Sequence, residues 1–193
     1  MLREAGATVD RNQKLADMSL PGVHASDKRK IEIVAKHLPL YRGLPLVLDA
    51  TIVSPLRANG QPRPRAAVID GVAIAAIENE KHTKYPELTH SSECKFLVLA
   101  GEIGGRWSAT ASKLIRDLAR VKSQSAAPRL RRSTAFAWEN RWWGMLSVAV
   151  QNALAATIVD DAPRMLHAWE GTGPPLGVLV HGEAPTVSRL PLR

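Results

Sequence analysis

Two acidic residues and two lysines of this chain are suited to metal-dependent chemistry. Glu32 and Asp49 each lie within a short run of alternating apolar residues, and Lys81 and Lys84 lie near the end of an alanine-rich segment. Carboxylate oxygens are ligands that Mg²⁺ prefers, and the backbone carbonyl of Ala50 could add a third oxygen. A bound divalent ion stabilises charge on a phosphate and lowers the pKa of an attacking water. These residues therefore indicate phosphodiester hydrolysis.

Two predicted strands position the acids. Residues 31–35 and 46–53 alternate with a period of two, and the Pro and Gly between them are typical of a connecting loop. If the strands pair as a hairpin, Glu32 and Asp49 come close on the same face. Two carboxylates on neighbouring strands repel each other unless a cation lies between them.

A predicted helix over residues 66–85, which Pro86 ends, positions the lysines. Its apolar stripe runs directly into Lys81 and Lys84. Two interpretations are open. The lysine stems cover apolar surface at the end of the helix, where cations also suit the helix dipole, or one ammonium reaches the carboxylates.

The remaining elements complete an α/β domain. The continuously apolar residues 96–100 predict a central strand covered on both sides. Ser108 is suited to cap the next helix, and Pro128 is suited to the first turn of a long helix that runs to about Ile158. We therefore expect a small mixed β-sheet, formed by a hairpin and a central strand and flanked by three helices.

The domain organisation follows from composition. Residues 28–158 form the expected α/β domain. Residues 1–27 are polar without a convincing period, and residues 159–193 are rich in Pro, Gly and short polar pieces. We expect these to be a flexible leader and a flexible tail.

The charge of the chain favours a polyanionic partner. A formal net charge of +8 and a pI near 10.1 indicate nucleic acid first and an anionic membrane second. A merely basic surface on a structural or interaction protein is the alternative.

Further residues are candidates for the site. Glu102 is a possible accessory acid, and tryptophans in the long helix either form core or stack bases. The candidates for phosphate contacts are Arg57, Arg63, Arg65, Arg106, Arg129 and Arg132.

Several other classes of protein are excluded. With Cys94 as its one cysteine, the chain has no internal disulfide and no cysteine-based zinc cluster. It has no apolar run long enough to span a membrane, no signal-peptide pattern, no Gly-x-Ser-x-Gly elbow and no P-loop. We expect a soluble intracellular protein that is not secreted and has no membrane partner.

Four motifs in order resemble a known family. They are residues 28–34 around Glu32, 48–56 around Asp49, 80–85 with both lysines, and the sequence Gly-Glu-Ile-Gly-Gly-Arg-Trp at 101–107. Together they resemble the restriction-like endonuclease domain, of the PD-(D/E)xK type, of non-LTR retrotransposon and reverse-transcriptase polyproteins. The similarity spans about residues 28–158.

The resemblance implies a restriction-endonuclease-like fold and a DNA-nicking activity that needs Mg²⁺ or Mn²⁺. Glu32 matches the first metal-binding acid and Asp49 the second. Lys81, Lys84 and Tyr85 match the lysine–tyrosine motif on the helix, whose lysine activates water. The family also implies DNA as substrate, a reverse transcriptase domain on the parent polyprotein and a nuclear location.

The chain departs from the family pattern at Thr51, which occupies the usual position of a lysine. Lys81 or Lys84 would then replace it. The alternative is a decayed copy that acts as a catalytically inactive, basic nucleic-acid-binding module. The expected zinc knuckle and polymerase are absent upstream, so the resemblance implies a C-terminal piece of a larger element protein.

Overall fold

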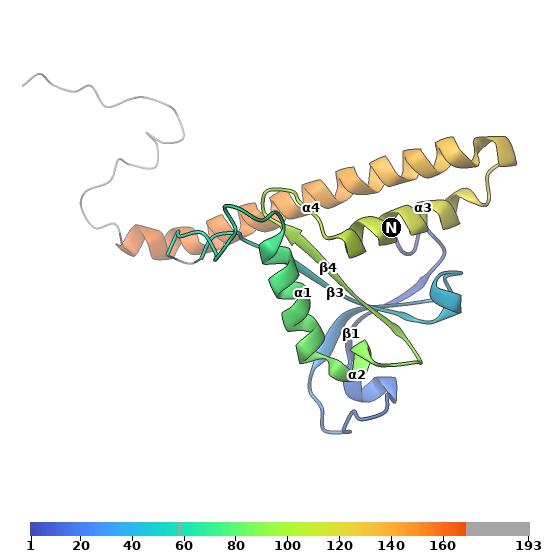
Figure 1. Ribbon diagram of the computed structural model, residues 1–193, viewed down its shortest axis with the longest axis horizontal. Coiled ribbons are helices and arrows are strands. Elements are labelled where there is room, and N and C mark those ends of the chain that lie inside the picture. Colours follow the sequence, from blue (N-terminus) through green and yellow to red (C-terminus); the bar gives the residue numbers. More distant parts are fainter. Residues whose placement is uncertain (58, 169–193) are drawn as a thin grey trace, which may run out of the picture. The chain divides into compact units, whose positions relative to one another are not determined.

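The two strands that carry the acids are neighbours in a four-stranded mixed sheet with the order β1-β2-β3-β4 (Figure 1). β2 pairs antiparallel with both β1 and β3, whereas β3 and β4 are parallel. This confirms the predicted mixed α/β architecture. The strands are β1 (Thr8–Lys14), β2 (Lys30–Lys36), β3 (Leu46–Val53) and β4 (Lys95–Glu102).

The computed structural model describes residues 1–57 and 59–168. The chain divides into two units, Met1–Asn152 and Ala153–Arg193, and the sheet belongs to the first. The longer helices are α1 (Val72–Lys84), α3 (Ala109–Ser123) and α4 (Arg131–Ala168). Shorter helical segments are α2 (Pro86–Thr89), η1 (Leu15–Met18), η2 (Tyr41–Gly43) and η3 (Pro128–Leu130).

Helices cover both faces of the sheet. Val47 on β3 packs in one apolar cluster with residues of α1 and α2, whereas its neighbours Leu46 and Leu48 pack in a second cluster with α3 and the first part of α4. This follows from the alternation of side chains along a strand. Asp49 has the same parity as Val47, so β3 directs Asp49 toward the face that α1 covers.

Local signals fix the ends of the helices. Ser108 caps α3, since its side-chain oxygen accepts a hydrogen bond from the backbone N–H of Ala111 at 3.1 Å. Pro128 begins the short turn that leads into α4, as the sequence predicts. Helix α1 begins at Val72 rather than at Ala66, after Gly71 with its positive φ of 72°.

The tryptophans of α4 belong to the core. Trp142 is fully buried, and its indole N–H donates to Oε2 of Glu4 at 2.7 Å. Trp138 and Trp143 are half-buried against the same cluster. The core interpretation is therefore confirmed for this part of α4.

The predicted leader is wrong as a flexible segment. Residues 8–14 form β1, and Leu15 and Leu20 are buried in the core beneath α1 and α2. β1 is missed because its sequence, Thr-Val-Asp-Arg-Asn-Gln-Lys, is almost entirely polar, as is common in edge strands.

Two further expectations need correction. β4 lies at the edge of the sheet rather than at its centre. The prediction was wrong because a continuously apolar strand indicates that both of its faces are covered, and does not indicate that it pairs with strands on both sides. α4 extends past Ile158 to Ala168, so residues 159–168 of the predicted tail are helical. Residues 169–193 of that tail lie outside the described residues.

Candidate active site

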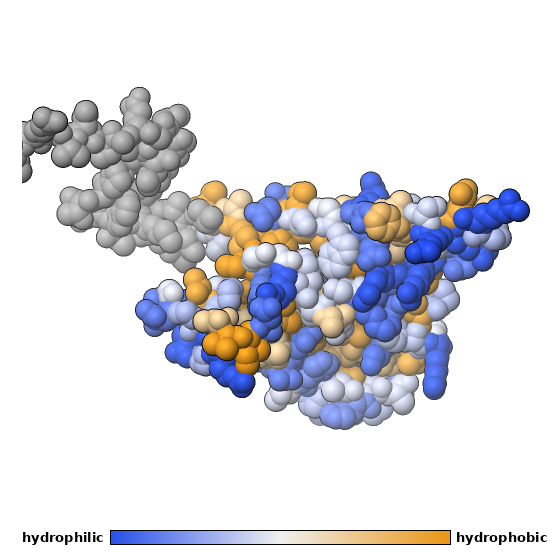
Figure 2. Space-filling model, turned by 45° about the horizontal axis from the view of Figure 1, so that its top comes forward, coloured by the Kyte–Doolittle hydropathy of each residue, from blue (hydrophilic) through white to orange (hydrophobic). Residues whose placement is uncertain are grey.

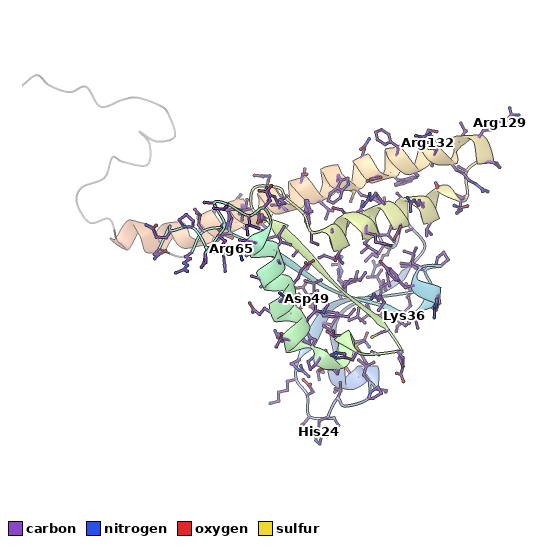
Figure 3. The ribbon with its side chains drawn as sticks, viewed as in Figure 1. His24, Lys36, Asp49, Arg65, Arg129 and Arg132 are labelled. Carbon is purple, nitrogen blue, oxygen red and sulfur yellow. The ribbon has the colours of Figure 1, made fainter. Side chains whose placement is uncertain are left out.

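Asp49 and Lys81 form an ion pair under helix α1. The Asp49 side chain is 4% exposed and that of Lys81 is 18% exposed. The Lys81 ammonium lies 2.8 Å from Oδ1 and 3.1 Å from Oδ2 of Asp49, so it donates to both carboxylate oxygens. Figure 3 labels Asp49 beside α1. The helix lysine thus reaches the acid on β3, which is one of the two interpretations that the sequence leaves open.

Glu32 lies where β2 separates from β3. The paired residues of the two strands end at Ile33 and Leu48, one residue short of Glu32 on β2 and one residue short of Asp49 on β3. At this point the backbone N–H of Ala50 donates to Oε2 of Glu32 at 3.0 Å, so the carboxylate replaces a main-chain acceptor. The side chain of Glu32 therefore closes the end of the hairpin ladder.

The negative charges of the site keep Lys81 protonated. Burial by itself lowers the pKa of Lys81, but the hydrogen bond and charge of Asp49, with smaller contributions from Tyr85 and Glu32, raise it above the ordinary lysine value of 10.5. At neutral pH, Lys81 is an ammonium that can supply positive charge and cannot accept a proton.

The donor set fits a hard divalent ion. A strand residue directs its N–H and C=O to the same edge, so the carbonyl of Ala50 faces the edge where its N–H meets Glu32. Within residues 1–57 and 59–168, no group of three or more His, Cys, Asp or Glu side chains could hold a metal ion. The two carboxylates and the carbonyl are nevertheless oxygen donors of the kind that Mg²⁺ and Mn²⁺ bind.

Lys84 and Tyr85 pack at the end of α1, and the structure shows no contact between them and the two acids among the described residues. Tyr85 is 3% exposed and its ring packs edge-on against Phe96, with ring centroids 5.7 Å apart. Lys84 is exposed, and its ammonium lies 5.1 Å from the centre of the Tyr85 ring. Of the two helix lysines, Lys81 is the one that contacts an acid in the described chain.

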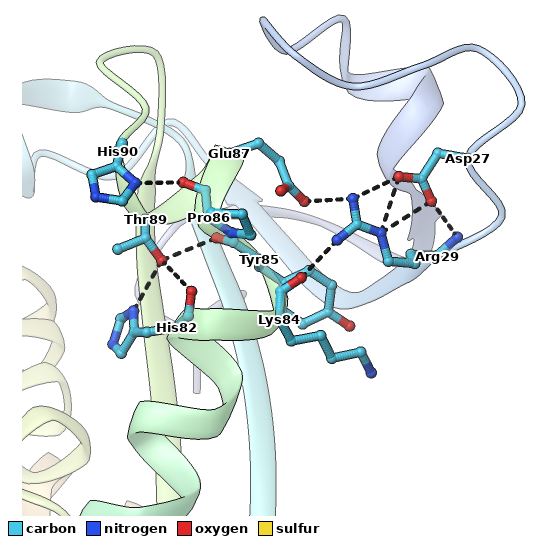
Figure 4. Close-up of polar contacts among 9 residues, drawn as sticks. All are labelled: Asp27, Arg29, His82, Lys84, Tyr85, Pro86, Glu87, Thr89 and His90. Carbon is cyan, nitrogen blue, oxygen red and sulfur yellow. Dashed lines mark hydrogen bonds and ion pairs between the residues drawn. The ribbon is translucent and has the colours of Figure 1, made fainter.

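A cluster around Arg29 holds the end of α1 against the start of β2 (Figure 4). The guanidinium of Arg29 forms ion pairs with Asp27 at 2.7 Å and Glu87 at 2.8 Å, and it donates to the carbonyl of Lys84 at 2.7 Å. The sequence shows Arg29 only as part of a basic run. The sequence near Arg29 offers one partner, Asp27, two residues earlier. The other partners of Arg29, on α1 and α2, are distant in sequence.

The predicted accessory acid is separate from Asp49. On the parallel pair, Asp49 lies opposite Val98, whereas Glu102 lies four residues further along β4, at a distance of roughly 13 Å. Glu102 is 12% exposed on its side chain and forms an ion pair of 3.7 Å with Arg106, which also pairs with Asp70 at 2.9 Å. Glu102 is therefore neutralised locally.

The predicted phosphate contacts do not form one surface. Arg57 and Arg65 are exposed in the loop after β3, while the Nε of Arg63 donates to the carbonyl of Ser54 at 2.8 Å. Arg129 on η3 and Arg132 on α4 are exposed at the N-terminal end of α4, whose first part packs on the other face of the sheet (Figure 3). In Figure 2, hydrophilic residues occupy several areas of the visible face, with hydrophobic residues between them.

Among the described residues, no helix combines the length and apolar composition that crossing a membrane requires.

The chain matches no protein-family model and no curated protein.

Proposed function

We propose that this chain is a Mg²⁺-dependent DNA endonuclease domain with a restriction-endonuclease-like fold, which nicks DNA by phosphodiester hydrolysis. The observation that carries the proposal is the convergence of Lys81 with the buried Asp49, next to Glu32 on the neighbouring strand. Lys81 contacts Asp49, and Glu32 is hydrogen-bonded to the backbone of Ala50, the residue after Asp49. This proximity supports the proposal.

The proposed roles follow from the contacts. Glu32, Asp49 and the carbonyl of Ala50 would hold Mg²⁺ or Mn²⁺, which when bound supplies Lewis-acid stabilisation of the phosphate and a more acidic water. The ammonium of Lys81, whose pKa is raised, stabilises negative charge as it develops on the phosphate. Because the pKa of Lys81 is raised rather than lowered, we assign it an electrostatic role rather than that of a general base.

DNA is the proposed substrate because of the basic composition and the position of the loop after β3. The formal net charge is +8, and Arg57 and Arg65 expose their side chains on the loop between β3 and α1, the two elements that carry Asp49 and Lys81. Contacts of these arginines with backbone phosphates would give salt-dependent affinity. A nuclear location and a reverse transcriptase domain on a parent polyprotein belong to this proposal through the motif resemblance.

Nicking of supercoiled plasmid by the full chain tests the proposal. We expect open circles with Mg²⁺ or Mn²⁺, none with excess EDTA, and a strong loss in Glu32→Gln. Asp17→Asn is the matched control, since Asp17 is an exposed acid on η1. Nicking that survives EDTA, or that Glu32→Gln performs as fast as the control, contradicts the proposal.

The second candidate is a nucleic-acid-binding module without catalysis. It is favoured by the Asp49–Lys81 ion pair. Lys81 alone neutralises the buried carboxylate of Asp49, so the carboxylate needs no metal ion. It predicts DNA binding that falls steeply with salt and that Glu32→Gln leaves unchanged, together with no metal-dependent nicking.

A further inference from the structure

Lys81 and a divalent cation require the same oxygen atoms. Both carboxylate oxygens of Asp49 accept hydrogen bonds from the Lys81 ammonium, at 2.8 and 3.1 Å. Because the Asp49 side chain is only 4% exposed, an ion that reaches these oxygens meets the ammonium at the same position. Two cations cannot share one buried carboxylate at contact distance without strong mutual repulsion.

We propose that Lys81 is a built-in counter-cation that competes with the divalent ion for Asp49, so that binding of the ion and release of Lys81 are a single exchange. This inference rests on the proposed function, since it requires that the site bind a metal ion. It adds that Lys81 weakens metal binding instead of supporting it.

The burial of the pair explains why such an exchange is useful. A buried carboxylate without a partner destabilises a protein, so Lys81 stabilises the metal-free chain. The lysine stem is flexible, and at 18% exposure the side chain retains a path to solvent. Once displaced from Asp49, the ammonium is free to face a phosphate held beside the ion. Glu32 stays bonded to the N–H of Ala50, so the second acid need not move.

Removal of the lysine charge should therefore strengthen metal binding. We expect Lys81→Met, which keeps most of the apolar stem, to bind Mn²⁺ about tenfold more tightly than the wild type, because a neighbouring charge changes such equilibria by this order. Lys84→Met is the matched control, since Lys84 lies on the same helix and packs over the Tyr85 ring. We expect its affinity to equal that of the wild type, and Asp49→Asn to lose binding.

Titration of the full-length chain with Mn²⁺, followed by the electron paramagnetic resonance of the free ion, measures these affinities without DNA or turnover. Lys81→Gln provides a second neutral variant that can still donate to Asp49, should Lys81→Met fail to fold. Equal or weaker binding by the neutral Lys81 variants, with binding still lost in Asp49→Asn, overturns the exchange and leaves the metal site standing. An absence of Mn²⁺ binding in both the wild type and these variants overturns the exchange and the proposed function together.

Discussion

The ammonium of Lys81 on α1 lies 2.8 Å from the buried carboxylate of Asp49 on β3, and this contact joins the helix to the sheet one residue before Ala50, whose N–H donates to Glu32. The pair has two consequences. It holds α1 over the sheet, and it keeps a cation beside oxygens that are suited to a divalent ion. The stability of the fold and the chemistry of the site therefore depend on the same residues.

Lys81 should make stability fall at high pH. The pKa of Lys81 is raised above 10.5 by Asp49 against the effect of burial, so its contribution to the free energy of unfolding is complete below pH 10.5. The contribution is lost as the pH rises through the folded-state pKa. Denaturant unfolding between pH 9 and pH 12 should show a steeper loss in the wild type than in Lys81→Met. Parallel curves for the two proteins would contradict the role of the ion pair in stability.

Glu4 should stabilise α4 through Trp142. Glu4→Ala leaves the indole N–H of a fully buried tryptophan without its 2.7 Å acceptor, which costs about 1–3 kcal/mol. Chemical denaturation followed by tryptophan fluorescence measures the loss. Glu4→Gln keeps an acceptor oxygen and should recover most of the stability. Equal stability of Glu4→Ala and the wild type would show that this contact does not anchor the N-terminal segment.

Replacement of Arg29 should loosen the end of α1. Arg29→Met removes ion pairs with Asp27 and Glu87 and a hydrogen bond to the carbonyl of Lys84. Because the Arg29 side chain is 36% exposed and solvent screens its charge, we expect a loss of about 1 kcal/mol. Lys28→Met removes an adjacent exposed charge and should change stability by less than about 0.5 kcal/mol. Hydrogen exchange should be faster at the amides of α1 in Arg29→Met alone. Similar exchange in both variants would rule out the proposed anchoring.

Gly101 leaves little room for a side chain. A Cβ at this position would lie 3.0 Å from the ring of Trp107, so Gly101→Ala must shift that ring by a few tenths of an ångström and should cost about 1 kcal/mol. Gly104→Ala is the matched control, because a Cβ there meets no atom within 4 Å. Thermal unfolding of both variants measures the difference. Equal melting temperatures would contradict the close approach of the Trp107 ring.

Local patterns predicted the parts of the fold that depend on nearby residues. The hairpin of β2 and β3 follows from period-two alternation and a loop, and the Ser108 cap follows from one hydroxyl before a helix. The contact of Lys81 with Asp49 required only that α1 pack on the correct face of β3. The spacing of apolar residues along α1 determined that face, although it could not choose between a snorkelling lysine and a paired one.

The features that the sequence missed depend on distant pairing. β1 joins the sheet through backbone hydrogen bonds, which its polar side chains do not predict. The edge position of β4 depends on which strands lie beside it, and its own sequence pattern does not determine this. Arg29 meets Glu87 only after the chain has folded. Arg63 and Arg106 looked suited to phosphate, but both already have protein partners.

The rate at which the full chain nicks supercoiled plasmid at saturating Mn²⁺, compared with that of Asp49→Asn, shows whether Asp49 is part of an active site. Circular dichroism establishes first that both proteins are folded. Because Asp49 is proposed to hold the ion, we expect a loss of at least about a hundredfold in the variant. Nicking by Asp49→Asn at the wild-type rate would contradict it.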